Sequence, residues 1–232
     1  MKNKIVKILH ILRSFNKTLY FNFKYLPFKI AIKLPILLYK PHFVKCKGKI
    51  ILESNNIRTG MIKLGFNQAH AYPHSGIIWE NNGGTIVFKG KALIGNNSSI
   101  CIGPNSFCTF GDNFSATTTF KLVCWNKIFF DYNVCFGWDN MVLDTNFHRL
   151  KNINGDFIGK GYGKINIAHD TWIATKCVIL GGTELQPFTV VATNSLLSKK
   201  YENSHVLLGG SPALIIKEGV YRDLNDDRII YE

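Results

Sequence analysis

Residues 167–202 fall into six consecutive hexads, and this repeat constrains the fold of the chain more than any other feature. The first position of each hexad is aliphatic: Ile167, Ile173, Ile179, Leu185, Val191 and Leu197. The fifth position is small in five of the six hexads: Thr171, Cys177, Thr183, Thr189 and Ser195, with Tyr201 in the last. A period of six matches neither the 3.6 of an α-helix nor the two of an amphipathic strand. A unit this short cannot bury its apolar face alone, so it must stack on copies of itself.

Each hexad predicts one short strand followed by one turn. The aliphatic residue then points inward and stacks on its counterpart one coil away, while the small residue fits where the chain bends. Three hexads close a triangular coil, so six hexads predict two coils of a parallel β-helix. Cys177 occupies a small-residue position, and we therefore expect it in the core.

Segments before residue 167 also contain short repeats and strand-like stretches, but with less regular spacing. The segments IGNNSSIC, IGPNSFCT and FGDNFSAT repeat every eight residues over 94–117. Strand-like stretches cover 48–52, 60–66 and 84–90, and Asn81-Asn82-Gly83-Gly84 is typical of a turn. We expect an all-β domain, a β-helix, over 46–205. It is flanked by an N-terminal segment, 1–45, and by a tail, 206–232, that contains a short helix.

Residues 145–164 interrupt the repeat with four glycines and several asparagines. This composition is typical of a loop. The repeat is recognisable in the sequence on both sides of this loop, so we expect the loop to project from the β-helix without ending it. Loops on rigid scaffolds often carry function.

The positive charge of the chain is concentrated at its N-terminus. Residues 1–45 hold ten Lys or Arg and no acid, while the rest of the chain has a net charge of only +3. Residues 1–20 predict an amphipathic helix whose apolar face comprises Ile5, Ile8, Leu9, Leu12, Phe15 and Leu19. Such a segment is suited to an anionic membrane surface. The alternative is that the apolar face packs on the β-helix or on a neighbouring subunit.

Several other classes of protein are disfavoured by the sequence. No stretch of 18 or more residues is free of charge, so no transmembrane helix is predicted. The six cysteines form no CxxC pair, and no cleavable signal is evident, which favours a reduced, cytoplasmic protein at most peripherally attached to the inner membrane face. We expect no metal site. No nucleic-acid module accompanies the positive charge, so we expect no nucleic-acid partner.

The segment GWDNMVLDTNFHRL, residues 137–150, lies where the projecting loop begins. It resembles a motif of sugar O-acetyltransferases in the hexapeptide-repeat acyltransferase superfamily, in which Trp-Asp or Trp-Asn precedes Asp-x-Asp-Phe-His. Here Asn146 stands where that family more often has Asp. The segment GGSPALIIK, residues 209–217, resembles the closing Gly-x-Pro-Ala-x-x-Ile-Lys of the family. The resemblance implies a left-handed β-helix, a homotrimer, acetyl-CoA as co-substrate and a cell-surface saccharide as acceptor.

The resemblance also implies a catalytic base, His148. A sugar hydroxyl is a poor nucleophile, and an imidazole, which ordinarily titrates near neutral pH, can remove its proton as it attacks a thioester. Asp139 and Asp144 are candidates to orient that imidazole, although both could instead satisfy turn amides. Trp138 and Asn146 are candidates to bind the sugar.

For acetyl-CoA, the resemblance implies a groove between adjacent β-helices of a trimer. The candidate residues are Trp172, Ala174, Ala192, Thr193, Lys199, Lys200 and Lys217. Two alternatives stay open at this point: N-acetylation of an amino sugar with the same base, and a non-catalytic β-helix that scaffolds an assembly. A serine-type acetyltransferase is disfavoured because its helical N-terminal domain is absent.

Overall fold

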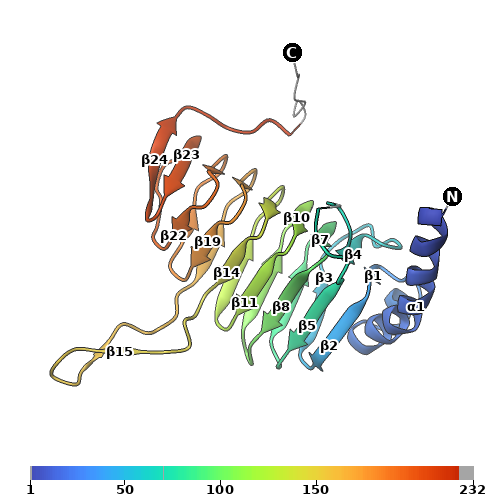
Figure 1. Cartoon of the computed structure of the whole chain (residues 1–232). Helices are drawn as coiled ribbons and strands as arrows, with labels where there is room; N and C mark the ends of the chain where they lie inside the picture. The colour runs from blue at the N-terminus through green and yellow to red at the C-terminus, as the bar shows by residue number, and fades with distance from the viewer. Residues whose placement is uncertain (1, 70, 225–232) are drawn as a thin grey trace, which may run out of the picture.

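The computed structural model describes the backbone of residues 2–69 and 71–224, with side chains from Ser14 onward in those ranges. In this part of the chain, three sheets wind into a parallel coil of triangular section (Figure 1). We name them sheets A, B and C. Sheet A contains β1 (Ile36–Leu38), β4 (Ile62–Phe66), β7 (Ala92–Gly95), β10 (Phe114–Thr118), β13 (Cys135–Trp138), β18 (Trp172–Ile173), β21 (Val190–Val191), β23 (Val206–Gly210) and β24 (Ala213–Glu218).

Sheets B and C form the other two sides of the coil. Sheet B contains β2 (Pro41–Cys46), β5 (Ile77–Asn81), β8 (Ser98–Ile102), β11 (Lys121–Cys124), β14 (Met141–Leu143), β19 (Val178–Leu180) and β22 (Leu196–Leu197). Sheet C contains β3 (Lys49–Leu52), β6 (Thr85–Phe88), β9 (Phe107–Phe110), β12 (Lys127–Phe130), β17 (Ile165–Ile167) and β20 (Glu184–Leu185). The predicted parallel β-helix is confirmed.

The hexads behave as the repeat predicts. Their leading aliphatic residues are all at most 1% exposed, and they stack in register, with Ile173 opposite Val191 and Ile179 opposite Leu197. The fifth residues are buried as well, Cys177 included. Hydroxyls at this position donate to the carbonyl three residues earlier, as from Thr171 Oγ1 to Ala168 O at 2.8 Å. A small hydroxyl is thus suited to the bend because it satisfies a carbonyl that the turn would otherwise bury unpaired.

The coils before the hexads are longer, with Ala92 opposite Phe114 where Ile173 is opposite Val191, and aromatic rings fill their core. Phe110 stacks on Phe88 at 5.0 Å and on Phe130 at 5.5 Å between ring centroids. Each of these rings is at most 1% exposed. Larger side chains thus occupy the extra volume that the longer coils enclose.

Both expected boundaries of the β-helix need correction. Strands β1 and β2 already pair with β4 and β5, so the sheets begin at Ile36 and not after residue 45. At the other end, β23 joins sheet A and turns back antiparallel into β24. The short helix expected in the tail is therefore wrong for residues 206–224, and residues 225–232 lie outside the described part.

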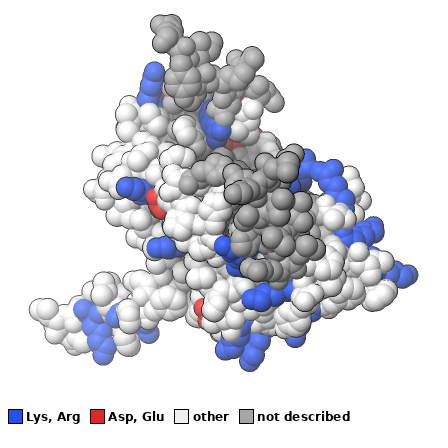
Figure 2. Space-filling model, turned by 45° about the vertical axis from the view of Figure 1, so that its right-hand side comes forward, with Lys and Arg blue, Asp and Glu red and all other residues white. Residues whose placement is uncertain are grey.

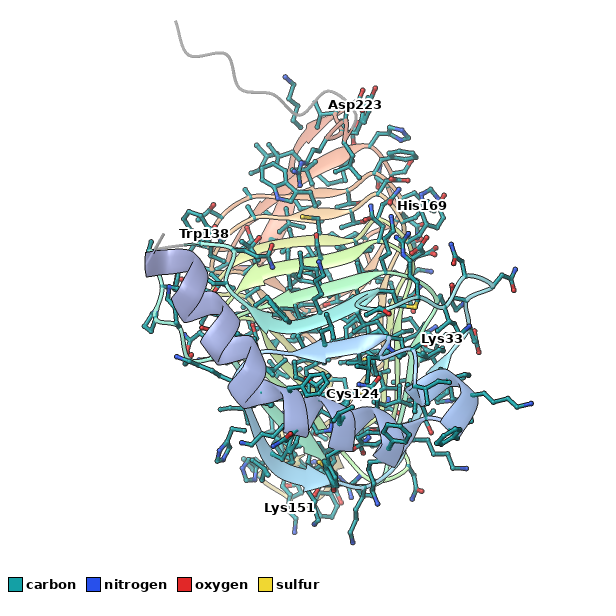
Figure 3. All side chains as sticks on the ribbon, turned by 90° about the vertical axis from the view of Figure 1, so that its right-hand side faces the viewer. Lys33, Cys124, Trp138, Lys151, His169 and Asp223 are labelled. Carbon is teal, nitrogen blue, oxygen red and sulfur yellow. The ribbon has the colours of Figure 1, made fainter. Side chains whose placement is uncertain are left out.

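The N-terminal helix α1 (Lys2–Tyr25) crosses the open end of the coil, followed by the short α2 (Phe28–Ala31) (Figure 3). Its buried face carries Phe21 and three polar residues. Ser14 Oγ, Thr18 Oγ1 and Asn22 Oδ1 accept hydrogen bonds from the backbone N–H groups of Lys40, Leu38 and Ile36 at 3.0, 3.2 and 3.2 Å. This ladder of side chains satisfies the edge of β1 that no strand covers.

Only two residues of the apolar face predicted for α1 have described side chains, Phe15 and Leu19. Phe15 is 43% exposed, and Leu19 is only partly buried. Phe15 is thus left largely uncovered by the β-helix of the same chain, whereas Leu19 is partly covered. Ile5, Ile8, Leu9 and Leu12 lie outside the residues whose side chains are described. None of the helices among the described residues combines the length and hydropathy that crossing a membrane requires.

Residues 145–164 project from the coil as predicted (Figure 1). Within them, β15 (Leu150–Lys151) and β16 (Phe157–Ile158) pair antiparallel. The guanidinium of Arg149 lies 3.6 Å from the Phe157 ring centroid, a cation–π contact across this hairpin. The interruption is thus an ordered arm, and the coil resumes at β17.

Candidate functional site

His148 lies at the root of the projecting hairpin, with its side chain exposed. A local turn holds its backbone: Asn146 Oδ1 accepts the His148 N–H at 3.2 Å, and Thr145 Oγ1 accepts the Phe147 N–H at 3.1 Å. Phe147 takes a left-handed φ of 61°, and its ring packs edge-on against Trp125 at 5.0 Å. The turn fixes where the His148 side chain leaves the backbone and leaves the imidazole accessible.

Gly161, on the returning strand of the arm, completes this turn. Its carbonyl accepts hydrogen bonds from the Asn146 N–H and the Thr145 hydroxyl, both at 3.2 Å. A Cβ at Gly161 would stand 2.6 Å from the His148 carbonyl oxygen, and its φ of +73° favours glycine. Sequence reasoning marked Gly161 only as a loop residue. The close approach of Gly161 to His148 could not be predicted from the composition of the loop.

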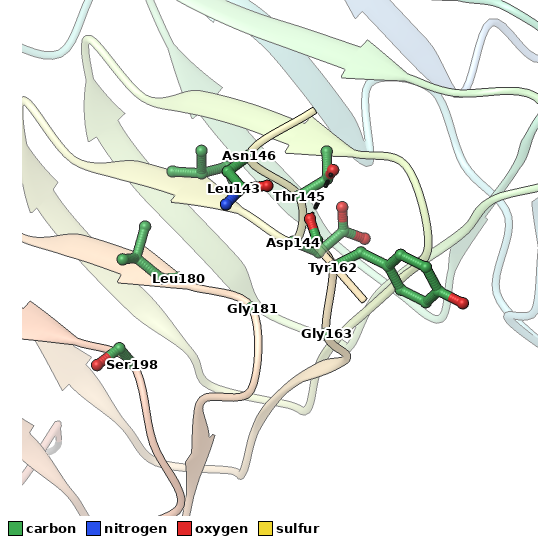
Figure 4. Close-up of a pocket in the computed structure, with 10 residues that line it drawn as sticks. Leu143, Asp144, Thr145, Asn146, Tyr162, Gly163, Leu180, Gly181 and Ser198 are labelled. Atoms are coloured by element: carbon green, nitrogen blue, oxygen red, sulfur yellow. Dashed lines mark hydrogen bonds between the residues drawn. The ribbon is translucent and has the colours of Figure 1, made fainter. Parts of the chain in front are cut away.

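Asn146 stabilises the turn and also lines a hollow beside it. The hollow, about 230 Å³, is lined by Leu143, Asp144, Thr145, Asn146, Gly161, Tyr162, Gly163, Leu180, Gly181 and Ser198. Figure 4 shows these residues where the arm leaves the coil. Because its amide oxygen is used by His148 N–H, Asn146 has its Nδ2 group left to meet a ligand.

Asp144 has a structural contact that occupies its carboxylate. The side chain is fully buried, and its two oxygens accept the N–H groups of Trp125 and Asn126 at 2.7 and 2.8 Å. Burial raises the pKa of this carboxyl, and the two backbone hydrogen bonds offset part of that rise. Within the described residues no hydrogen bond joins Asp144 to His148. The structure thus supports the turn-amide role and does not bring Asp144 to the imidazole.

Asp139 lies at a different corner from His148. It precedes β14, where sheet A passes into sheet B, whereas His148 follows β14, where sheet B passes into sheet C. Four residues, including the whole of β14, lie between Asp139 and Asp144, and five strand rises span at most about 16 Å. A motif that is continuous in sequence is therefore split between two edges of the coil.

Asp139 has a partner that sequence reasoning missed. Tyr72, 67 residues earlier, donates its hydroxyl to Asp139 Oδ2 at 2.6 Å, and its ring meets Trp138 edge-on at 5.7 Å. The hydrogen bond to Asp139 is the main reason that the pKa of Tyr72 rises to about 12. Trp138 remains 42% exposed, so a ring face is free to contact a ligand. No sequence pattern linked Tyr72 to this pair.

The corner between sheets A and B is lined by small residues. Gly137 faces the backbone of Ala174, where a Cβ would meet the carbonyl carbon at 3.1 Å, and a Cβ at Gly209 would meet the Ala192 Cβ at 3.2 Å. Strand register continues this column, because β13 pairs β18, β18 pairs β21 and β21 pairs β23. Thr193 is exposed at the same corner. We call this column, with Trp138 and Asp139, the groove corner.

Trp172 and Lys217 line a second hollow, of about 520 Å³, on the outer face of sheet A. Arg222 lies with its guanidinium 4.9 Å from the Trp172 ring centroid. Val190 and Leu207 complete the apolar floor. Sequence reasoning missed Arg222, since a cation in a mixed-charge tail gives no signal of its own.

Lys199 and Lys200 do not join the other predicted acetyl-CoA residues. They follow β22, on the side of the coil where the arm leaves. Lys200 pairs with Glu202 at 3.1 Å, and Lys199 lies 5.5 Å from the Tyr201 ring centroid. We call this side, with His148, the arm corner. The predicted site is thus divided between two corners of one chain. Among the described residues, no group of three His, Cys, Asp or Glu side chains is placed to hold a metal ion.

No protein-family model matches the chain, and no curated protein sequence matches it. Its structure is similar to that of the polySia specific acetyltransferase NeuO, at a TM-score of 0.56 and 14% identity over 82% of this chain and 92% of that one. It also matches the polysialic acid O-acetyltransferase OatWY, at a TM-score of 0.38 and 17% identity over 83% of this chain and 90% of that one. A mutant of AntD, an N-acyltransferase from Bacillus cereus, matches at a TM-score of 0.34 and 15% identity over 76% of this chain and 83% of that one. The last two scores are too low to argue from.

The similarity to NeuO concerns the fold, because 14% identity says little about function. It extends over most of both chains, so the whole coil is compared and not one sheet. The predicted architecture is confirmed: the chain is a left-handed parallel β-helix.

Proposed function

We propose that this chain is an acetyl-CoA-dependent O-acetyltransferase that modifies a hydroxyl of a cell-surface saccharide or its lipid-linked precursor. One observation carries the proposal: an accessible histidine stands at the root of an ordered arm, in a fold shared with an acetyltransferase. Trp138, Asp139 and the small-residue column lie across sheet B from it. We place the activity in the cytoplasm, at the inner face of the membrane.

We further propose that the active form is a homotrimer with each site built from two copies. A head-to-tail contact that closes into a ring brings one corner of a protomer against a different corner of the next. If sheet B faces the three-fold axis, the arm corner of one copy meets the groove corner of its neighbour. That contact would unite His148 with Trp138, Asp139 and the small-residue column.

Two features of the surface support this assembly. The outer face of sheet B near its C-terminal end is apolar and only partly buried, through Val123, Met141, Leu143, Val178, Leu180 and Leu196. The arm also exposes Leu150, Phe157 and Ile158 at 65, 54 and 54%. Apolar area of this extent marks an interface more often than a solvated surface.

In this site a ring nitrogen of His148 takes the proton of the acceptor hydroxyl as its oxygen attacks the thioester carbonyl carbon. The carbon–sulfur bond then breaks, and the protonated imidazole returns its proton to the leaving CoA sulfur. Asp139 of the neighbouring copy would hold the imidazole tautomer, as Tyr72 holds Asp139. Trp138 offers a ring face to the sugar, and Lys199, Lys200 and Lys217 offer charge to the phosphates of CoA.

Subunit mixing tests both the base and the shared site. We expect His148→Ala and Asp139→Ala trimers each to lose most activity, with a loss of 10²- to 10⁴-fold for the base. Random mixed trimers should recover about a quarter of the wild-type rate, because one contact in four pairs an intact arm corner with an intact groove corner. His42→Ala, which changes another exposed histidine, is the control and should stay near wild type.

Mixed trimers that stay inactive would contradict the shared site, and a near wild-type His148→Ala enzyme would contradict the base. Mass spectrometry of the product, with and without hydroxylamine, distinguishes an O-acetyl ester from an amide. An amide product would overturn the O-acetyl assignment while leaving the catalytic base in place.

A further inference from the structure

Helix α1 presents two chemically different faces at the end of the coil. The face toward β1 carries the Ser14, Thr18 and Asn22 ladder, and its contacts are complete. Phe21 and Tyr25 add apolar packing on that side, with Phe21 against the Trp79 ring at 4.8 Å. The helix is therefore anchored by this polar ladder and by Phe21, while Phe15, Tyr20 and Phe23 stay exposed.

The outward side of α1 and α2 alternates apolar residues and lysines. Phe23, Phe28 and Ile32 are 44, 70 and 56% exposed, and the residue after each is an exposed lysine. The Phe23 and Phe28 rings touch at 5.7 Å, so the two helices form one surface. We call this the end-cap patch: Phe23, Lys24, Phe28, Lys29, Ile32 and Lys33.

The charge around the end-cap patch has one sign. The first acidic residue of the chain is Glu53, after twelve Lys or Arg. Figure 2 shows many blue side chains and few red ones on the side of the molecule that includes this end. The described lysines of the patch have no acidic neighbour in sequence, and Figure 3 shows Lys33 reaching away from the coil. The surface is therefore suited to an anionic partner.

Two kinds of occupant fit an exposed apolar face, and the charge favours one. A second copy meeting this face would oppose cations with cations, which costs free energy. An anionic bilayer offers phosphates to the lysines and an acyl boundary to the rings, the arrangement that interfacial helices use. The repeated pairing of one apolar side chain with one lysine matches that boundary.

We propose that the end-cap patch docks the protein on an anionic lipid surface, with the coil axis directed away from the membrane. Phe23, Phe28 and Ile32 enter the headgroup boundary, and Lys24, Lys29 and Lys33 meet lipid phosphates. In the proposed trimer the three coils run side by side, so three patches face the same membrane and add their binding. Docking is independent of the acetyl-transfer chemistry.

Sedimentation with lipid vesicles tests the proposal on the full-length protein. We expect binding to vesicles of phosphatidylglycerol mixed with phosphatidylcholine, weakening as salt rises from 0.1 to 0.5 M, and little binding to phosphatidylcholine alone. The Lys24→Gln, Lys29→Gln, Lys33→Gln variant should bind about 100-fold more weakly, from about 1 kcal/mol per lysine. Phe23→Ser with Phe28→Ser should weaken binding at least tenfold without changing the charge.

The matched control removes three lysines elsewhere: Lys89→Gln, Lys91→Gln and Lys127→Gln, all exposed and outside α1 and α2. It should bind within a few fold of wild type. The proposal is overturned if wild type ignores anionic vesicles, if the control loses binding as strongly as the patch variant, or if the patch variants instead change the oligomeric state. Acetyl transfer to a water-soluble acceptor should be unchanged in every variant, so a failure of docking is separable from a failure of the proposed acetyl-transfer activity.

Discussion

The groove corner and the arm corner belong to the same coil and differ in how the chain turns. At the groove corner the turn is short in every coil of the hexad region, and small residues follow one another from Gly137 through Ala174 and Ala192 to Gly209. At the arm corner one turn is replaced by twenty residues that form a hairpin. Neither change reaches the core, where Ile165 and Ile167 stack on their neighbours with no exposure.

This difference shows how a repeat scaffold divides its tasks. A corner kept narrow leaves a column of small residues, Gly137, Ala174 and Ala192, along which an extended ligand can lie. A corner that is opened can carry a polar group away from the coil, as the arm does for His148. The groove corner and the arm corner each supply only half of the residues of the proposed site. The following experiments test the two corners separately.

The largest effect is expected from Gly161→Ala at the arm corner. A Cβ there would stand 2.6 Å from the His148 carbonyl oxygen, so the turn that holds His148 must shift. A displacement near 1 Å lowers turnover roughly 100-fold. Steady-state kinetics would measure the loss, with the thermal midpoint expected to change little because the arm is outside the core.

Gly159→Ala is the matched control for that substitution. Gly159 also has a left-handed φ, +65°, but a Cβ there meets nothing within 4 Å. Both variants place alanine at a left-handed φ, but only the alanine at position 161 has a Cβ in close contact with His148. Equal activity in the two would show that the position of the His148 turn does not limit catalysis.

A smaller effect is expected from Tyr72→Phe at the groove corner. The variant removes the hydroxyl that donates to Asp139 at 2.6 Å and keeps the ring against Trp138. Hydrogen bonds to charged groups contribute about 1.5–3 kcal/mol, so kcat/KM should fall about tenfold or somewhat more. Tyr132→Phe, at the corner on the opposite side of sheet A, should have no such effect.

The same hydroxyl gives a pH dependence with a defined sign. The pKa of Tyr72 rises to about 12 in the folded chain, above the ordinary value of 10.0. Its contribution to stability is therefore complete below pH 10 and is lost as pH rises through 12. The difference in thermal midpoint between wild type and Tyr72→Phe should narrow over that interval. A gap that widened would mean that the phenol does not donate to Asp139.

The smallest effect on turnover is expected from Asp144→Asn. An amide can accept only one of the two N–H groups that the carboxylate now accepts, and an unsatisfied buried N–H costs about 1–3 kcal/mol. Thermal unfolding should shift down by about 5 °C in a chain of this size. Asp112→Asn is the control, because one exposed oxygen there accepts both turn amides, from Lys91 and Asn113, and an amide oxygen can do the same.

The core of the fold was predictable because its signal is local and repeated. Ile173, Ile179 and Val191 recur at a spacing that only a stacked coil satisfies, and each is buried where the spacing places it. The buried face of α1 was not predictable in the same way. Beside Phe21, its buried contacts are the polar Ser14, Thr18 and Asn22, which bond to a strand edge, and an apolar pattern cannot indicate these polar contacts.

The candidate site was predictable in its residue types and not in its geometry. The motif from Trp138 to His148 is contiguous in sequence, which suggested one cluster, but β14 carries the chain from one corner to the next between its two halves. Tyr72 was missed because its contact with Asp139 spans 67 residues. The role of Asp139 and of the acetyl-CoA residues stays a prediction until a trimer with ligand is tested.

The ladder on α1 also limits how long the molecule can be. A stack of parallel coils is a one-dimensional polymer whose terminal strand can template another, and each free N–H of β1 would be an attachment point for a further coil. By occupying the N–H groups of Ile36, Leu38 and Lys40 with side chains, α1 terminates growth at that end. The antiparallel return of β24 along β23 changes the strand direction at the other end of sheet A, so a further parallel strand cannot continue sheet A there.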